Sequence, residues 1–556
     1  MSYKKILKKP KRFNNYFQTI SNSDNSKYKE LKMEYVYDLP NEWVTKLKSY
    51  NLNQYIADIE NYGIKITWDF ICKFVLQGIS TTKFLNVSNF AELYEIALAI
   101  EDKKLKKENG QYFTPEDVAL IMSNWFKELD AYNVCDVACG TGKLILTYLD
   151  LIGIEESIKL LNEGRIYLYD LDKTALTICK TSILIKYGKQ YINKIHAIYG
   201  DFLDNGIHLP QNCKVISNPP YARISTISST WCNSKIQRET KEFYASFMEK
   251  IILESDKSVI ITPYSFIGGK KFYPLRALMN DYSGFIIAFD NVPGNIFCGR
   301  KHGVFNTNTS NSVRAAITVV QNKSNKGFRL TPLIRFKNEE RQKLLKCKLL
   351  ESNLSGKYQI VDKANNAYAK CQKELQVVFD EWVNKSTQCL QDITSSKLHN
   401  RYIYMPNTCR YFTTASSYQL KRAGIIVLGF DNEEAFNFAY CLINSSFAYW
   451  WWRIYDGGIT YTAGLLQRLP VFLNLLTDDD KKFFKDTTNE MIELEQNCIV
   501  TKLNSGKIQE NIKFPSKYKD KINDRLLKIL GFNNISTRLF DIIHKNNYFG
   551  TLNEDV

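Results

Sequence analysis

The chain has 556 residues, of which 44% are hydrophobic and 24% charged, so it is not a disordered protein and is too long for one hydrophobic core. Its net charge of +16 is compatible with a polyanionic partner, although a composition rich in Lys, Asn, Ile and Tyr, as AT-rich coding DNA produces, explains it equally well. Thirteen cysteines without a C-x-x-C pair and only five histidines argue against zinc, disulfide and histidine-based metal sites, which favours a reducing compartment, the cytoplasm.

The first predicted segment, residues 1–108, begins with the basic arm KKILKKPKR and continues with apolar-periodic stretches that predict helices. Its first residues contain no apolar run of signal-peptide length, so secretion is not expected. The segment ends in the charged stretch EDKKLKKENG, which is typical of a helix end and linker. We therefore expect a small helical N-terminal region.

The second predicted segment, residues 109–335, alternates short apolar runs with longer amphipathic ones. The strand candidates are NVCDVA (133–138), RIYLYD (165–170), IHAIYG (195–200), CKVISN (213–218), SVIITP (258–263), GFIIAFD (284–290) and AAITVV (315–320). Helical stretches separate most of the early runs. This alternation predicts an α/β domain with a largely parallel sheet.

The last two predicted segments, residues 336–475 and 476–556, lose this rhythm. Residues 368–385 predict a charged helix, and residues 476–556 read as helical, Lys-rich and mostly amphipathic. The uncharged run 435–452 is barely long enough to span a bilayer, and Asn and Ser interrupt it at 437, 444, 445 and 446. A buried helix rich in aromatic residues is the better interpretation, so no membrane association is expected.

A glycine-containing turn lies between an apolar strand and an apolar helix in VCDVACGTGKLIL, residues 134–146. Glycines there allow backbone N–H groups to approach a ligand at a helix N-terminus. The turn lacks the G-x-G-x-x-G spacing and a following G-K-[ST], which disfavours a nucleotide triphosphate. Cys135 and Cys139 flank the strand end without further Cys or His, so they do not predict a metal site.

The next strands also end in polar residues. The second ends at Asp170, where doubly wound folds grip ribose hydroxyls, and the third ends in YGDFL, where Asp201 could accept from an adenine amine and Phe202 could cover the ring. The fourth ends in KVISNPPYAR, residues 214–223, whose prolines cannot continue a strand and hold a rigid turn. Parallel strands bring these tips to one edge of the sheet, where such folds bind ligands.

With these motifs in order, residues 109–320 resemble the Rossmann-like catalytic domain of S-adenosylmethionine-dependent amino-methyltransferases, in particular the N6-adenine DNA methyltransferases. GQYFTP (110–115) resembles the family's segment at the methionine end of the cofactor, and DVACGTG resembles its D-P-A-C-G-S-G turn, with Val137 in place of proline. The motif order resembles the family's gamma arrangement. The resemblance implies cofactor-binding roles for Tyr112, Phe113, Thr114, Asp136, Ala138, Gly140, Gly142, Asp170, Asp201 and Phe202. Thr114-Pro115 also fits an ordinary helix start.

The resemblance implies that Asn218, Pro219, Pro220 and Tyr221 are catalytic. The Asn218 amide oxygen and the Pro219 carbonyl would accept from the adenine amine, and Tyr221 would stack on a base flipped out of the duplex. Phe297 resembles the aromatic residue on the opposite face of that base, with Phe305 as the alternative; core packing explains either phenylalanine equally well.

Residues 336–475 resemble a target-recognition region, because a helix with an L-N-S-like stretch precedes a loop and an L-P strand. The predicted DNA contacts, any of which could instead be a solvated charge, are Arg410, Lys421, Arg422, Arg453 and Arg468. The expected fold is therefore a Rossmann-like doubly wound methyltransferase domain preceded by the helical N-terminal region. A mixed α/β recognition domain and a helical C-terminal tail follow it.

The expected function is transfer of a methyl group from S-adenosylmethionine to N6 of adenine in double-stranded DNA, without a metal, within a restriction-modification or host-defence system or as an orphan methylase. A separate restriction endonuclease is a possible partner, and the oligomeric state is open. Three alternatives remain: an RNA or protein-glutamine methyltransferase, a single-chain restriction-modification enzyme with a nuclease, and a non-catalytic DNA-binding protein. The large C-terminal region favours DNA, and residues 1–108 are short for a nuclease domain and lack a convincing P-D…E-x-K pattern.

Overall fold

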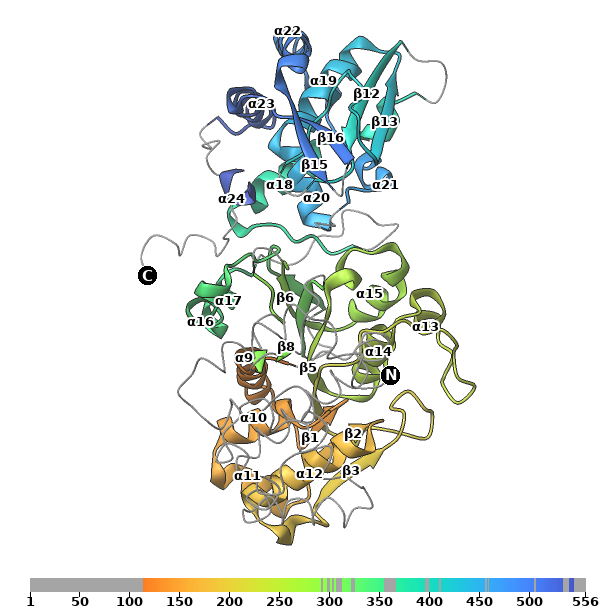
Figure 1. The fold of residues 1–556 in the computed structure, drawn as a ribbon, viewed down its shortest axis with the longest axis vertical. Coiled ribbons are helices and arrows are strands. Elements are labelled where there is room, and N and C mark those ends of the chain that lie inside the picture. The colour runs from red at the N-terminus through yellow and green to blue at the C-terminus, as the bar shows by residue number, and fades with distance from the viewer. Residues whose placement is uncertain are drawn as a thin grey trace, which may run out of the picture. The chain divides into compact units, whose positions relative to one another are not determined.

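The computed structural model describes residues 114–291, 294–297, 301–302, 305–306, 313–321, 326–354, 367–395, 400–409, 412–455, 458, 460–504, 507–533 and 540–544. The chain divides into two compact units (Figure 1). Among described residues, the first unit holds those up to Phe266, Lys271–Phe328 and Phe336–Leu350, and the second holds Ile267–Lys270, Arg329–Arg335 and those from Glu351 onwards. The predicted segment 1–108 lies outside the described residues.

An eight-stranded sheet with the order β10-β6-β9-β5-β4-β1-β2-β3 is the centre of the first unit. Its strands are β1 (Asn133–Val137), β2 (Ile166–Asp170), β3 (Ile195–Tyr199), β4 (Cys213–Ser217), β5 (Lys257–Pro263), β6 (Ser283–Phe289), β9 (Ala315–Val320) and β10 (Gly327–Leu330). The seven strands predicted from the apolar runs are all present. β10 is an addition, as is the short pair β7 (Lys301–His302) and β8 (Phe305–Asn306) outside this sheet.

The strands β3, β2, β1, β4 and β5 pair in parallel, whereas β9 lies antiparallel between β5 and β6. The largely parallel α/β sheet is therefore confirmed. Strand β4 has no polar position that would face water: its residues are all buried, and even Lys214 is only 5% exposed. This agrees with a parallel strand covered on both faces.

Helices connect and cover these strands. They are α9 (Glu116–Lys127), α10 (Lys143–Ile152), α11 (Ile154–Asn162), α12 (Lys173–Tyr187), α13 (Lys235–Thr240), α14 (Phe243–Glu254), α15 (Tyr273–Met279), α16 (Arg341–Leu344) and α17 (Cys347–Ser352). Helix α10 packs on α9 and β4, α12 on β2 and β3, and α14 on β5. Alternating strands and covering helices give the doubly wound arrangement that the sequence predicts.

Over its described residues, the second unit is built of helices and three two-stranded sheets. The helices are α18 (Gln376–Lys385), α19 (Glu433–Asn444), α20 (Ser446–Tyr455), α21 (Ala463–Gln467), α22 (Asp478–Leu494), α23 (Ser516–Ile529) and α24 (Asp541–His544). The strands are β11 (Gln388–Cys389), β12 (Arg401–Pro406), β13 (Ile425–Phe430), β14 (Pro470–Val471), β15 (Ile499–Asn504) and β16 (Lys507–Ile512). Core residues between Ala367 and Ile543 belong to one cluster, so the 475/476 boundary does not separate two cores.

Three sequence predictions for this unit need correction. The run 435–452 forms two buried helices rather than one, because Ser445 leaves the helical conformation and its hydroxyl bonds Leu442 O. The helix predicted over 368–385 begins only at Gln376. The tail predicted as helical contains the β15–β16 hairpin, whose two strands pair antiparallel from Ile499↔Ile512 to Asn504↔Lys507. No described helix combines the length and apolarity needed to cross a membrane. Apart from these corrections, the division of the chain into four segments stays a prediction.

Candidate active site

The carboxyl ends of β4, β1, β2 and β3 are neighbours at one edge of the sheet. Val137 pairs in register with Ser217 on one side and with Tyr169 on the other, and Asp170 pairs with Tyr199. The chain runs from β1 to β3 in one direction and then returns to β4 on the other side of β1. This is the topological switch point at which open α/β sheets bind ligands. The four predicted strand tips are therefore brought together.

The turn after β1 has a left-handed backbone at three positions: φ is 56° at Ala138, 53° at Gly140 and 92° at Gly142. A Cβ on Gly142 would lie 2.6 Å from Cys179 Sγ, so this glycine allows close packing of α12. A Cβ on Gly140 would meet nothing within 4 Å. The turn is therefore closed toward the core at Gly142 and open at Gly140, ahead of the first residue of α10, Lys143.

Asp136 lies beneath this turn rather than on its open side. Its side chain is fully buried, and Oδ2 accepts from the Ile145 backbone N–H at 3.1 Å. Its Oδ1 is buried without a hydrogen-bond partner among the described residues. Burial raises the pKa of Asp136 well above its usual value. The hydrogen bond from the Ile145 N–H to the Asp136 carboxylate therefore stabilises the first turn of α10.

Asp170 connects the tip of β2 to the glycine turn. Its carboxylate accepts from the backbone N–H groups of Gly140 and Asp172, each at 2.7 Å. Burial raises the pKa of Asp170 to about 6, although these two N–H donors act in the opposite direction. Each carboxylate oxygen can accept more than one hydrogen bond, so the group can shape the turn and still accept from ligand hydroxyls.

Asp201 and Phe202 have different surroundings. Asp201 accepts from the Leu203 N–H and from the Trp231 indole N–H, both at 3.0 Å. Phe202 is only 3% exposed and packs against Phe247 at a centroid distance of 5.4 Å, an environment that favours a core role. Sequence reasoning missed Trp231, because nothing in the spacing of the chain links it to the tip of β3.

The turn after β4 is tied to the segment before α9. The Asn218 amide Nδ2 donates to the Thr114 hydroxyl at 3.0 Å, and both residues were predicted as site residues. The alternative reading of Thr114 as a helix cap is wrong, because Pro115 occupies that position and no side chain caps the helix. The Tyr221 hydroxyl donates to Ile261 O at 3.1 Å on β5. Two separate contacts thus orient Asn218 and Tyr221.

Phe297, the predicted second aromatic wall, contacts Tyr221 directly. The ring centroids are 5.8 Å apart and the planes are inclined at 68°, an edge-to-face contact. Phe297 is 1% exposed. A base stacked between two rings needs about 3.5 Å on each face, so a base enters this contact only when the rings separate. The side chain of the alternative, Phe305, is outside the described set.

The other predicted residues belong to the second unit or lie outside the described part of the chain. Tyr112, Phe113 and Arg410 lie outside the described residues. Among the predicted DNA contacts, Lys421 is exposed. Arg422 is half-buried and bonded to Thr408 and Asn511, Arg453 is buried with its guanidinium 5.7 Å from the Trp452 ring, and Arg468 donates to Gly464 O at 3.1 Å. These environments favour structural roles for Arg422 and Arg453.

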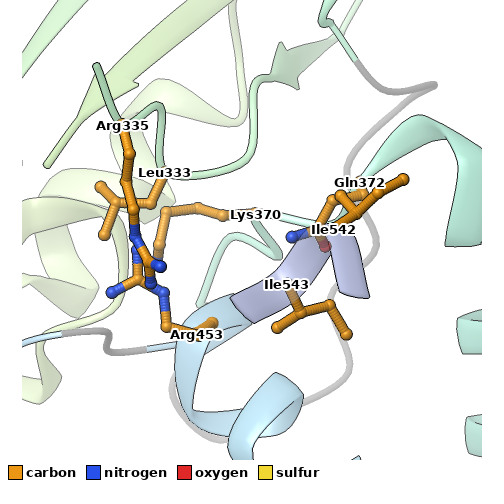
Figure 2. A pocket seen from close by; sticks show the side chains of 7 residues that line it. All are labelled: Leu333, Arg335, Lys370, Gln372, Arg453, Ile542 and Ile543. Carbon is orange, nitrogen blue, oxygen red and sulfur yellow. The ribbon is translucent and has the colours of Figure 1, made fainter. Parts of the chain in front are cut away.

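Figure 2 shows a small cavity in the second unit, where three buried cationic side chains, Arg335, Lys370 and Arg453, lie near Leu333, Gln372, Ile542 and Ile543. Its volume of about 10 Å³ is room for about one water molecule, so it cannot hold a cofactor. A larger cavity of about 270 Å³ includes Lys214 and Arg165, which lie at the amino ends of β4 and β2, away from the predicted tips. Within the described ranges, no group of three or more His, Cys, Asp or Glu side chains could hold a metal ion.

Known proteins resemble the chain over part of its length. Residues 86–300 match the family model for "N-6 DNA Methylase". The Type I restriction enzyme MpnII methylase subunit of Mycoplasma pneumoniae is 24% identical over 166 residues, which cover 27% of this chain and 27% of that protein. The chain thus matches little more than a quarter of the length of this curated relative.

Solved structures of restriction-modification proteins also align with it. A nuclease-deletion mutant of the Type ISP enzyme LlaGI, in complex with a DNA substrate mimic, is 12% identical with a TM-score of 0.44 and covers 90% of this chain and 67% of its own. The Type I restriction enzyme EcoKI M protein is 16% identical with a TM-score of 0.32 over 62% of this chain and 72% of its own. Both TM-scores lie below 0.5, so the fold of this chain is assigned from its own sheet, as described above. The family whose model matches residues 86–300, the N-6 DNA methylases, is the family that the strand-tip motifs of this chain resemble.

Proposed function

We propose that the protein transfers the methyl group of S-adenosylmethionine to N6 of an adenine in double-stranded DNA. The observation that carries this function is the position of the Asn218–Tyr221 turn. It follows β4, directly beside the glycine turn after β1, and the donor end of its amide is held by Thr114. The acceptor end, Asn218 Oδ1, is the atom that we assign to the substrate amine.

The chemistry follows from what a planar amine needs. The lone pair of the adenine amine is delocalised into the ring, so the nitrogen is a poor nucleophile. Hydrogen bonds to Asn218 Oδ1 and the Pro219 carbonyl would favour a pyramidal nitrogen whose lone pair is free to attack. Because two prolines fix the turn, these acceptors need no reorganisation at the moment of reaction. No protein nucleophile is required.

The residues at the strand tips fit S-adenosylmethionine, which supplies the electrophilic methyl group. The open side of the turn at Gly140 leaves space for a ligand. The carboxylates of Asp170 and Asp201, held by backbone and indole donors, are suited to accept from ribose hydroxyls and from an adenine amine respectively. Tyr112 and Phe113, outside the described residues, complete the proposed set.

The target base would be flipped out of the duplex and stacked on Tyr221, since the amine is unreachable inside the helix. In the free protein the Tyr221 ring already packs against Phe297, so the incoming base takes the place of that contact. In the free protein, Phe297 covers part of the Tyr221 ring. In the complex, the flipped base would cover that part of the ring instead.

DNA is the proposed polymer for two reasons. A large second unit follows the catalytic residues and can supply a surface for sequence recognition, with exposed Lys421 as one candidate contact. The curated relative is named a restriction enzyme methylase subunit. We therefore place the protein in a restriction-modification setting, as the modifying component and with a nuclease on another chain.

The test is a methyl-transfer assay with tritiated S-adenosylmethionine on unmethylated plasmid DNA. The wild-type chain should label DNA, and Asn218→Ala should lower the rate by about 100-fold or more, since a preorganised polar contact is lost. The affinity of Asn218→Ala for S-adenosylmethionine should remain within about twofold of wild type, because we assign Asn218 to the adenine that receives the methyl group and not to the cofactor. Label found only in RNA or protein would overturn the DNA assignment, and magnesium-dependent cleavage by the purified chain would restore the nuclease alternative.

A further inference from the structure

The loop that carries Phe297 is packed into the first unit. Asn295, Ile296 and Phe297 are 2%, 1% and 1% exposed. The Phe297 backbone N–H donates to Asn295 Oδ1 at 2.8 Å, and the Phe297 ring contacts Tyr221. The position of the ring therefore depends on the backbone of Asn295 and Ile296.

Arg341, the first residue of α16, holds this backbone. Its guanidinium donates to Asn295 O at 2.8 Å and to Ile296 O at 2.5 Å. Two of its nitrogens also bond the Asp117 carboxylate, with Nη2 to Oδ1 at 2.9 Å and a second bond from Nε. Such a two-point pair fixes the plane of the guanidinium, which a lysine ammonium cannot reproduce.

Asp117 connects the same pair to the other end of the catalytic turn. It lies in the first turn of α9, three residues after Thr114, whose hydroxyl accepts from the Asn218 amide. One ion pair therefore joins the loop that contacts Tyr221 to the segment that holds Asn218. Arg341 itself is 8% exposed, so this pairing takes place largely away from water.

We propose that Arg341 is a positioning residue for the target-base pocket. It sets the distance between the Phe297 loop and α9, and through these two elements it sets the orientation of Tyr221 relative to Asn218. This role rests on the proposed function. Arg341 lies beyond the matched range 86–300 and inside the segment predicted to read DNA sequence.

The variant that tests this role is Arg341→Lys, which keeps the charge and loses the planar fork. The matched control is Arg165→Lys. Arg165 makes the same kinds of contact, to Ala131 O, to Tyr132 O and to the Glu163 carboxylate, but it precedes β2 at the opposite end of the sheet. A general effect of losing a clamped arginine should appear in both variants, and a pocket effect only in the first.

Two readouts are needed. Amide hydrogen exchange is followed at Gly294 and Phe297, whose N–H groups bond Phe336 O and Asn295 Oδ1. Methyl transfer to plasmid DNA gives kcat and the KM for S-adenosylmethionine. In Arg341→Lys, we expect exchange at these amides to accelerate about tenfold or more, kcat to fall about 10- to 100-fold, and the KM for S-adenosylmethionine to stay within about twofold. In Arg165→Lys, these quantities should stay near wild type.

The positioning role is overturned if Arg341→Lys leaves exchange at both amides unchanged, or if it transfers methyl groups at the wild-type rate. It is also overturned if the KM for S-adenosylmethionine rises by the same factor as kcat falls. The same conclusion follows if Arg341→Lys and Arg165→Lys lower the activity and the thermal unfolding midpoint equally. A wild-type chain without transfer activity would overturn the proposed function instead. In that case the exchange measurement still decides whether Arg341 holds the loop.

Discussion

At the scale of single residues, the carboxylate of Asp170 has the most informative environment at the proposed site. It is held by two backbone N–H groups, and yet burial raises its pKa to about 6 from the usual 3.8. Because the folded pKa lies above the unfolded one, this group's contribution to stability is present at low pH and is lost as pH rises through about 6. Ligand hydroxyls donate more strongly to the ionised carboxylate than to the neutral acid.

We therefore predict that affinity for S-adenosylmethionine falls as pH drops below about 6, by up to about tenfold per pH unit once Asp170 is protonated. Asp170→Asn should bind more weakly at pH 7 and should lack this component of the pH dependence. Calorimetric titration from pH 5 to 7.5 checks both. Parallel pH profiles for the two proteins would contradict the role of Asp170.

The identity of the residues at the strand tips could be read from the sequence, but their contacts could not. Asp170, Asp201 and Asn218 follow apolar runs, and parallel strands necessarily bring such positions to one edge. The bond from Trp231 to Asp201 depends on how a long connection folds back, which periodicity does not encode. The same holds for Arg341, which comes from a segment far along the chain.

At the scale of elements, the turn between β1 and α10 contains two glycines with different requirements. Both have positive φ, but only Gly142 lies against another element, since its Cβ would collide with Cys179 of α12. Gly140 faces open space. The pair allows backbone strain and steric collision to be separated within one turn.

We predict that Gly140→Ala costs about 1 kcal/mol of stability, because a left-handed backbone disfavours a side chain. It should fold and should bind S-adenosylmethionine more weakly. Gly142→Ala should lose clearly more stability, by about 2–4 kcal/mol, because overpacking adds to the strain. Denaturant unfolding of both variants checks the order. Equal losses would mean that α12 shifts to accept the added methyl group.

Strand positions could be predicted in the first unit because each apolar run is short and bounded by turn residues. The position of β9 between β5 and β6 could not be predicted, because an apolar run does not indicate which strands it will pair with. In the second unit, the 435–452 run was correctly read as buried and helical, but the break at Ser445 depends on hydrogen bonds that a continuous apolar run conceals. The β15–β16 hairpin was missed because its charged, Lys-rich setting resembles an amphipathic helix.

At the scale of the whole molecule, two compact units share the chain. The core of the second is rich in aromatic residues: Trp450 is fully buried, stacks on Trp382 at a centroid distance of 5.9 Å and donates to Gln372 Oε1 at 2.8 Å. The proposed cofactor residues that the structure describes belong to the first unit. Damage to the second core should therefore leave cofactor binding intact.

We predict that Trp450→Ala destabilises the second unit by about 3–5 kcal/mol, because a large buried side chain is lost. Affinity for S-adenosylmethionine should remain within about twofold, whereas methylation of DNA should fall at temperatures where the second unit unfolds. Val377→Ala, a change at a 65% exposed position of α18, is the control. Calorimetry beside a binding titration checks this. Equal loss of cofactor binding would show that the units fold as one.

The return of residues 336–350 to the first unit has a practical consequence for anyone who wishes to exchange recognition regions between relatives. A chimera joined at the predicted boundary of 335/336 would import Phe336, which packs on Phe289, and Arg341, which clamps Asp117, from a foreign parent. A junction after Leu350 would leave both contacts with their native partners. Grafts of the second unit should therefore join the two parents after Leu350. Because segments 267–270 and 329–335 also belong to the second unit, they should be exchanged together with it.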